Sequence, residues 1–224
     1  MTFNTPKQIE IDMKKFVILF IILIPIMLSA QRNSASIKIG HFNPSATDGG
    51  FILGYEGGRF VDKNLRVGWS IDWFNKNYVD KTLVEEFDSY FGPAGQLNQL
   101  RAETNLHSVP LMFTMSGLFP MSPRVSAYVT GGVGAEMLLI FYNNFENPTT
   151  DEFQAAFDFS WRAGMGILYE LGYRSDIFGE IVYHASEPSW TYEVNDDNLR
   201  RRGTFERVFD MSGVMARVGV RFYW

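Results

Sequence analysis

Histidine and serine are the side chains here that are best suited to acid–base and nucleophilic chemistry. The three histidines, His41, His107 and His184, are far apart in the sequence, and no two lie at a spacing typical of metal ligands. Only one stretch places a histidine near a hydroxyl, because His184 and Ser186 would share one face of a strand. Such a pair, with acidic residues nearby, is one way to build a nucleophile and its base. The sequence has neither a Gly-x-Ser-x-Gly turn nor a Walker loop, and it predicts no cofactor and no metal site.

In several stretches of the sequence, apolar residues alternate with a second set that includes the charged residues. In the final stretch, 208–224, one set of alternate residues is apolar, whereas the other set carries Arg217 and Arg221. A period of two predicts a strand with two different environments. This strand is longer than most strands of soluble proteins. Its polar face would either meet water or fill the interior of a closed barrel whose apolar face meets lipid.

Eight stretches of the sequence are predicted to be strands. They are 36–42, 51–60, 65–78, 103–119, 124–142, 153–170, 177–192 and 208–224. The segments 61–64, 120–123 and 171–176 are short connections, whereas 43–50, 79–102, 143–152 and 193–207 are mostly longer. An even number of strands with alternating short turns and long loops predicts an all-β, eight-stranded antiparallel up-and-down transmembrane barrel.

The apolar face of these strands is expected to contact lipid. In 153–170 the odd positions are almost all aromatic or aliphatic, and 124–142 and 65–78 repeat this pattern. Aromatic residues end the apolar faces, namely Trp73, Phe141 and Phe153 toward the loops and Phe119, Tyr169, Phe222 and Trp224 toward the turns. This placement predicts two interfacial belts about 25 Å apart. The alternative is a soluble β-sandwich or lipocalin-like barrel with an apolar inside.

The first 30 residues have the layout of a secretory signal peptide. Lys14 and Lys15 precede an unbroken apolar run at 16–28, and small residues lead to a predicted cleavage site after Ala30. The run is shorter than the roughly 20 residues of a membrane-spanning helix, although an uncleaved anchor is the alternative. Translation is expected to start at Met13. The domains are therefore 1–30, a signal peptide, and 31–224, a barrel.

Charge and cysteine content exclude several classes of protein. The chain has a net charge of -5, and residues 1–30 contain three bases and two acids, so residues 31–224 carry -6. This argues against a nucleic-acid partner. The absence of cysteine excludes an acylated lipoprotein and a disulfide scaffold.

The C-terminal residues carry a resemblance to a known family. Alternate apolar residues that end on an aromatic, here Val220, Phe222 and Trp224, resemble the C-terminal signal of bacterial outer-membrane β-barrels. The assembly machinery of those barrels recognises that signal. The whole of 31–224 resembles the small barrels of the OmpA transmembrane-domain and OmpX type. This resemblance implies export through the inner membrane to a Gram-negative outer membrane, with turns in the periplasm and loops outside.

The inward positions of such a barrel carry a balanced set of charges. Six bases, Lys38, Arg66, Arg124, Arg162, Arg217 and Arg221, face six acids, Glu56, Asp72, Glu136, Asp158, Glu170 and Glu180. An eight-stranded barrel has room inside only for its own side chains. Unpaired charges there would cost several kcal/mol each, so a balanced set predicts a network of ion pairs. We expect a plugged barrel and no general porin; a narrow channel for small solutes is the alternative.

The His184 stretch resembles, in part, the His-x-Ser-Asn motif of outer-membrane lipid A deacylases. It departs from the motif because Glu187 and Pro188 follow where Asn is expected. His184 and Ser186 also lie at alternate positions that face the interior of the barrel. An enzyme that acts on lipid would need them on the outer surface or at the rim. We interpret them as a polar pair inside the barrel, and the protein as non-catalytic.

The long loops are where a binding function is expected. In 82–91 the apolar residues lie at helical spacing, which predicts a short amphipathic helix that either folds on the rim or contacts a partner. Arg200, Arg201 and Arg202 would pair with lipopolysaccharide phosphates, unless they are simply solvated. The expected role is structural or recognitive, with lipid, lipopolysaccharide and an extracellular protein ligand as partners.

Overall fold

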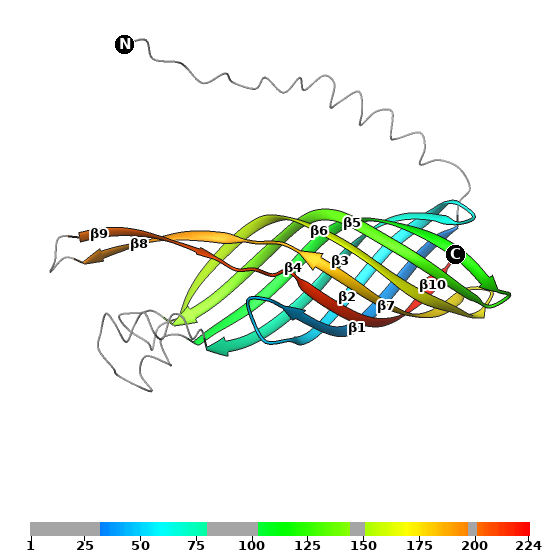
Figure 1. Ribbon diagram of the computed structural model, residues 1–224, viewed down its shortest axis with the longest axis horizontal. Coiled ribbons are helices and arrows are strands. Elements are labelled where there is room, and N and C mark those ends of the chain that lie inside the picture. The colour runs from blue at the N-terminus through cyan, green and yellow to red at the C-terminus, as the bar shows by residue number, and fades with distance from the viewer. Residues whose placement is uncertain (1–31, 80–102, 144–150, 197–200) are drawn as a thin grey trace, which may run out of the picture. The chain divides into compact units, whose positions relative to one another are not determined.

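The described residues of this computed structural model form a closed antiparallel barrel and a separate two-stranded sheet (Figure 1). The structure describes residues 32–79, 103–143, 151–196 and 201–224. The strands are β1 (Asn33–Pro44), β2 (Gly50–Asp62), β3 (Leu65–Val79), β4 (Glu103–Ser122), β5 (Val125–Asn143), β6 (Asp151–Gly172), β7 (Ser175–Ala185), β8 (Ser189–Asp196), β9 (Arg201–Val208) and β10 (Gly213–Tyr223). The barrel order is β1-β10-β7-β6-β5-β4-β3-β2, so the predicted eight-stranded up-and-down barrel is confirmed.

The two last predicted strands are each interrupted, which corrects their predicted extent. The stretch 177–192 divides into β7 and β8 at Ser186 to Pro188, where Pro188 cannot donate a ladder hydrogen bond. The stretch 208–224 divides at Phe209 to Ser212, after which β10 begins. Much of the predicted loop 193–207 is not a loop, because its residues belong to β8 and β9, which pair with each other.

The three short connections are two-residue turns of one construction. They are Lys63-Asn64, Pro123-Arg124 and Tyr173-Arg174, tighter than the predicted segments. In each hairpin the register shifts by one residue just before the turn, for example between Phe60 and Asp62. Such a bulge increases the local twist and terminates regular pairing. We call this side of the barrel the turn end and the opposite side the loop end.

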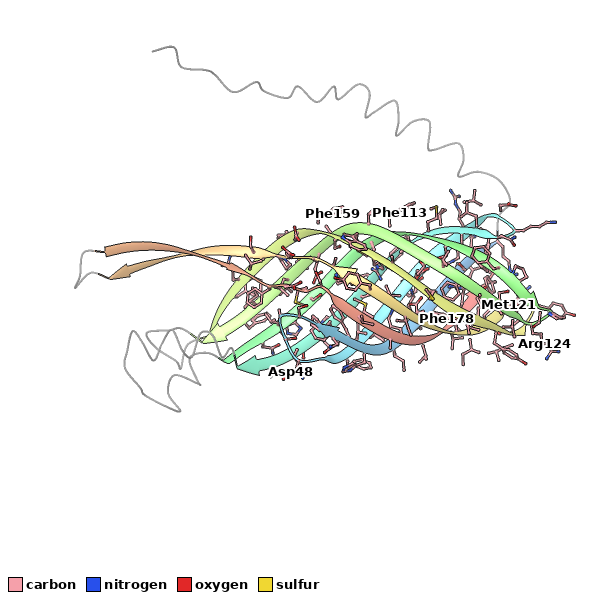
Figure 2. All side chains as sticks on the ribbon, viewed as in Figure 1. Asp48, Phe113, Met121, Arg124, Phe159 and Phe178 are labelled. Carbon is pink, nitrogen blue, oxygen red and sulfur yellow. The ribbon has the colours of Figure 1, made fainter. Side chains whose placement is uncertain are left out.

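The outer surface of the barrel is apolar along the strands. Figure 2 shows Phe113 and Phe159 on this surface, and their side chains are more than half exposed. The predicted aromatic belts are exposed as well, including Trp73 and Phe153 near the loop end and Phe119 and Trp224 near the turn end. A soluble protein rarely exposes so large a continuous apolar surface. The apolar set of alternate residues on each strand therefore faces outward, as predicted. The soluble alternatives, which have an apolar inside, do not fit.

Two predictions fall outside the described residues. These are the signal peptide at 1–30 and the amphipathic helix at 82–91. Among the residues that are described, no helix is long and apolar enough to span a membrane.

Candidate functional site

The lumen of the barrel is the place where the chemistry-bearing side chains meet. Inward glycines leave the room that the larger side chains fill. A Cβ atom at Gly54 would collide with the Asp72 carboxylate, and one at Gly166 would lie 2.6 Å from the Tyr128 ring. Long arginines and tyrosines can therefore extend across a barrel of only eight strands.

Asp72 is the centre of one group of ion pairs. It accepts a hydrogen bond from Arg162 Nη1 at 2.7 Å and another from Arg217 Nη1 at 3.0 Å. Arg162 also donates through Nη2 to Ser70 Oγ at 3.1 Å. These side chains come from β3, β6 and β10, so the contacts tie together strands that are not neighbours in the barrel.

Glu180 joins this group to a second one nearer the turn end. Its carboxylate pairs with Arg217 Nη2 at 2.8 Å and with Lys38 Nζ at 3.3 Å, and it accepts a hydrogen bond from Tyr128 Oη at 2.8 Å. Lys38 also pairs with Glu56. All these side chains are almost completely buried. A charge removed from water is tolerable only when it is paired and hydrogen-bonded in this way.

Glu56 and Arg221 extend the network to the turn end. Glu56 pairs with Arg66, whose Nε donates to Ser34 Oγ at 2.8 Å. The Arg221 guanidinium is buried beside two rings, with its Cζ atom 5.0 Å from the Phe178 centroid and 5.8 Å from that of Tyr128. We refer to this continuous set of side chains, from Asp72 to Arg221, as the polar network.

A ring of apolar side chains fills the loop-end part of the lumen. Every strand of the barrel gives it at least one fully buried inward side chain. Its members are Phe42, Ile52, Phe74, Leu106, Leu138, Ile140, Ala156, Val182, Phe209, Met211 and Met215. The rings of Phe42 and Phe74 meet edge to face with their centroids 5.1 Å apart. We refer to these residues as the apolar ring.

The break between β9 and β10 contributes the outermost residues of the apolar ring. Phe209 N–H donates to Pro188 O and Met211 N–H to Ser186 O, both at 2.9 Å. On the other side, Ser45 N–H donates to Ser212 O at 2.9 Å and Ala46 N–H to Asp210 O at 2.8 Å. The break is thus hydrogen-bonded on both sides, and it holds Phe209 and Met211 over the lumen.

Asp210 stabilises this break from the outside of the ring. Its carboxylate accepts a hydrogen bond from Ser212 N–H at 2.9 Å. Partial burial alone would raise the pKa of Asp210, but hydrogen bonds from the backbone and hydroxyl of Ser212 hold it below its usual value. The carboxylate form is the one that can accept these bonds.

His184 and Glu136 lie at the boundary between the polar network and the apolar ring. His184 Nε2 is 2.7 Å from Glu136 Oε2, and the other carboxylate oxygen accepts a hydrogen bond from Ser108 Oγ at 2.6 Å. Both partners of the ion pair have no exposed surface. Ser186, in contrast, is directed to Asp158 at 3.4 Å. Within the part of the chain that the structure describes, His184 therefore has a carboxylate and no hydroxyl as its hydrogen-bond partner, and its side chain is fully buried.

Comparison with known proteins identifies the fold. No protein-family model matches the sequence, and no curated protein matches it either. A major outer membrane protein from Thermus thermophilus is similar in structure, with a TM-score of 0.59 at 13% identity, over 88% of this chain and 100% of that one. The chain folds as a small outer-membrane β-barrel. Neisserial surface protein A gives a TM-score of 0.51 at 12% identity, over 88% of this chain and 98% of that chain.

The fold and the apolar outer surface together place this outer-membrane barrel in a bacterial outer membrane, as its sequence predicted. At identities of 12% and 13% the likeness concerns the fold alone. What the barrel does must therefore be argued from its own side chains.

Three of the predicted network residues are not buried in the lumen of this outer-membrane barrel. Arg124 occupies a two-residue turn and is exposed, and Figure 2 shows it beside Met121 at the turn end. Glu170 is exposed next to the bulge that precedes the third turn. Both predictions were wrong because the strands extend past the closed interior. Asp158 is half-buried and accepts a hydrogen bond from Glu187 N–H at 2.7 Å near the loop end.

The remaining predicted sites lie apart from the lumen. Val220, Phe222 and Trp224 face outward on and just after β10. Arg200 is outside the described residues, and Arg201 and Arg202 begin β9.

The sequence reasoning missed the apolar ring and one acid. The sequence contains a signal for the ring, because Phe42, Phe74 and Leu106 are apolar residues at alternate positions that are otherwise polar. Asp176 was missed because it follows a turn; it is buried and accepts a hydrogen bond from Tyr223 Oη.

Proposed function

We propose that this outer-membrane barrel is a closed, non-catalytic scaffold that presents its loop-end segments for recognition and does not conduct solutes. The observation that supports this function is the filling of one lumen at two successive levels. The polar network occupies the turn-end part and the apolar ring occupies the loop-end part. A porin of this size would need an open path through both.

The two levels oppose solute passage for different physical reasons. An ion that passed through the polar network would have to separate ion pairs such as Arg217–Asp72, whose partners are buried. Water that entered the apolar ring would have to wet side chains such as Phe74 and Leu106, and apolar constrictions resist wetting. Either level alone would suppress conduction.

Conductance of the purified protein in a planar bilayer tests this function. Unboiled and boiled samples should differ in electrophoretic mobility, which shows that the barrel is folded before it is tested. We expect the folded protein to give no steady channel steps. A large and steady single-channel conductance would contradict the closed scaffold and favour a channel for small solutes.

The proposal also gives the loop-end segments a function, which is recognition of lipopolysaccharide or another ligand. The sheet of β8 and β9 pairs from Ser189↔Val208 to Asp196↔Arg201, and β9 begins with Arg201 and Arg202, two of the three arginines expected to contact lipopolysaccharide. We expect that changing Arg200, Arg201 and Arg202 together to Gln weakens binding of the barrel to lipopolysaccharide. Changing the same three residues to Lys keeps the charge and serves as the control. Equal binding by all three proteins would remove this contact from the proposal.

Assembly of the barrel is expected to depend on its outward C-terminal residues. Phe222 is half exposed on the lipid-facing side, and so is Val218 on the same face of β10. If the assembly machinery reads the terminal pattern, Phe222→Ala should lower the amount of folded barrel in cells more than Val218→Ala does. Refolding of both variants in detergent shows whether the loss concerns assembly or stability.

A further inference from the structure

The rim at the turn end carries a regular set of exposed cations. Four backbone carbonyls at equivalent positions each accept an N–H from another strand of the barrel. Phe60 N–H donates to Arg32 O, Leu118 N–H to Asn64 O, Glu170 N–H to Arg124 O and Tyr223 N–H to Arg174 O, at 2.7 to 3.1 Å. Three of these four acceptor residues are arginines, and Lys63 directly precedes the fourth.

These backbone bonds make the rim a rigid support for its cations. Each tight turn is held by a bulge at its start and by a hydrogen bond from another strand. Arg32 is also held by its side chain, which donates to Tyr173 O and lies 3.9 Å from the centroid of the Tyr223 ring. The three turns that carry Lys63, Arg124 and Arg174 stand about two strand spacings apart, roughly 10 Å along the rim. The order of the rim lowers the entropy cost of binding a ligand there.

Few acids oppose these cations on the described part of the rim. Arg32, Lys63, Arg124 and Arg174 are exposed, and the exposed acids beside them are Asp62 and Glu170. Asp62 is partly engaged, because its carboxylate accepts a hydrogen bond from Lys63 N–H at 2.7 Å. Among the exposed side chains of the described rim, four cations thus stand beside two acids, whereas residues 31–224 as a whole carry -6.

Apolar side chains lie directly beside the cations on the outer surface. Met121 precedes the second turn and Leu171 precedes the third, with exposures of 70% and 58%. Tyr173 is completely exposed next to Arg174. A ligand that fits this surface has an anionic head at the level of the turns and an apolar body along the barrel wall.

We propose that the turn-end rim binds the phosphate head groups of anionic phospholipids in the leaflet that surrounds it. The basis is charge complementarity on a lipid-facing surface: the second and third turns each place a cation beside an exposed apolar side chain, Met121 and Leu171 respectively. Cations near a membrane surface are attracted to an anionic leaflet. Spacing around the rim favours several separate lipids over one compact polyanion.

Quenching of Trp224 fluorescence by brominated lipids tests this proposal. Trp224 lies at the turn end, so the other tryptophans are replaced by Phe to leave it as the reporter. The folded barrel is placed in phosphatidylcholine vesicles that contain either brominated phosphatidylglycerol or brominated phosphatidylcholine. We expect the anionic lipid to quench more strongly, and the difference to shrink at high salt.

Matched charge variants locate the effect. Changing Lys63, Arg124 and Arg174 together to Gln should reduce the preference for the anionic lipid several-fold. Changing Arg124 and Arg174 together to Lys keeps the charge at the same turns and should leave the preference intact. The proposal is overturned if the unmodified barrel shows no preference, or if the Lys variant loses it as fully as the Gln variant does. Boiled and unboiled mobility verifies that each variant is folded.

Discussion

The turn-end part of the lumen is filled by charged side chains that are held by hydrogen bonds, whereas the loop-end part is filled by apolar side chains. In the polar network, the chemical identity of each side chain matters, because Asp72 accepts hydrogen bonds from both Arg162 and Arg217. In the apolar ring, volume matters, because side chains such as Phe74 and Leu106 pack against other buried apolar side chains. Swaps that conserve volume are tolerated in an apolar core, but a buried charge does not tolerate loss of its partner. The two parts of the lumen are thus filled by two kinds of contact that should fail differently.

Arg217→Met should have the largest effect on stability. It leaves Asp72 and Glu180 buried without the cation that they share, and we expect a loss of about 3–5 kcal/mol. Urea unfolding in lipid vesicles, followed by tryptophan fluorescence, measures this loss. Arg124→Met is the matched control, since Arg124 is an exposed turn residue and its loss should cost less than about 0.5 kcal/mol. Equal stability of the two variants would mean that the polar network does not hold the barrel together.

Phe74→Ala tests the apolar ring in the same assay. Phe74 has no exposed surface and contacts Phe42, so its truncation should leave a cavity and cost about 3–5 kcal/mol. Phe74→Leu fills most of the space and should cost less than about 1.5 kcal/mol. If both variants lose the same stability, the loss does not depend on the volume removed from the apolar ring. The contrast with the polar network would then be weaker.

Glu136→Gln probes the boundary between the two regions. The amide keeps the shape of the side chain but removes the charge that His184 and Ser108 contact, so we expect a loss of about 1–3 kcal/mol. Asp158→Asn, at a half-buried acid, should lose less in the same unfolding experiment. A larger loss of stability for Asp158→Asn would mean that Asp158, near the loop end, stabilises the barrel more than Glu136 does.

Asp210→Ala should have the smallest effect. The carboxylate is only partly buried, so losing its bond from Ser212 should cost less than about 1 kcal/mol. Hydrogen exchange of the Phe209 and Met211 amides measures whether the break between β9 and β10 opens more often. Unchanged exchange would show that the backbone bonds to Pro188 and Ser186 suffice.

Most of the fold followed from the sequence, but the extents of elements near the rims did not. Alternation identified eight strands and their outward faces, because a period of two leaves no freedom in which side a residue faces. It wrongly placed Arg124 and Glu170 in the lumen, because the alternation of residues does not show how far a strand extends past the closed interior. It also missed the interruption at Pro188, where a strand pattern continues although the ladder does not.

The sequence by itself determined which residues of this outer-membrane barrel face lipid and which face the lumen. Only the closed structure decided which lumen residues meet, because the staggered strands set their relative heights. Arg217 pairs with Asp72 across 145 positions of the chain, and no local pattern links the two. The division of the lumen into a polar network and an apolar ring is likewise tertiary. It depends on one apolar residue from each strand reaching the same level, which each strand's own sequence cannot specify.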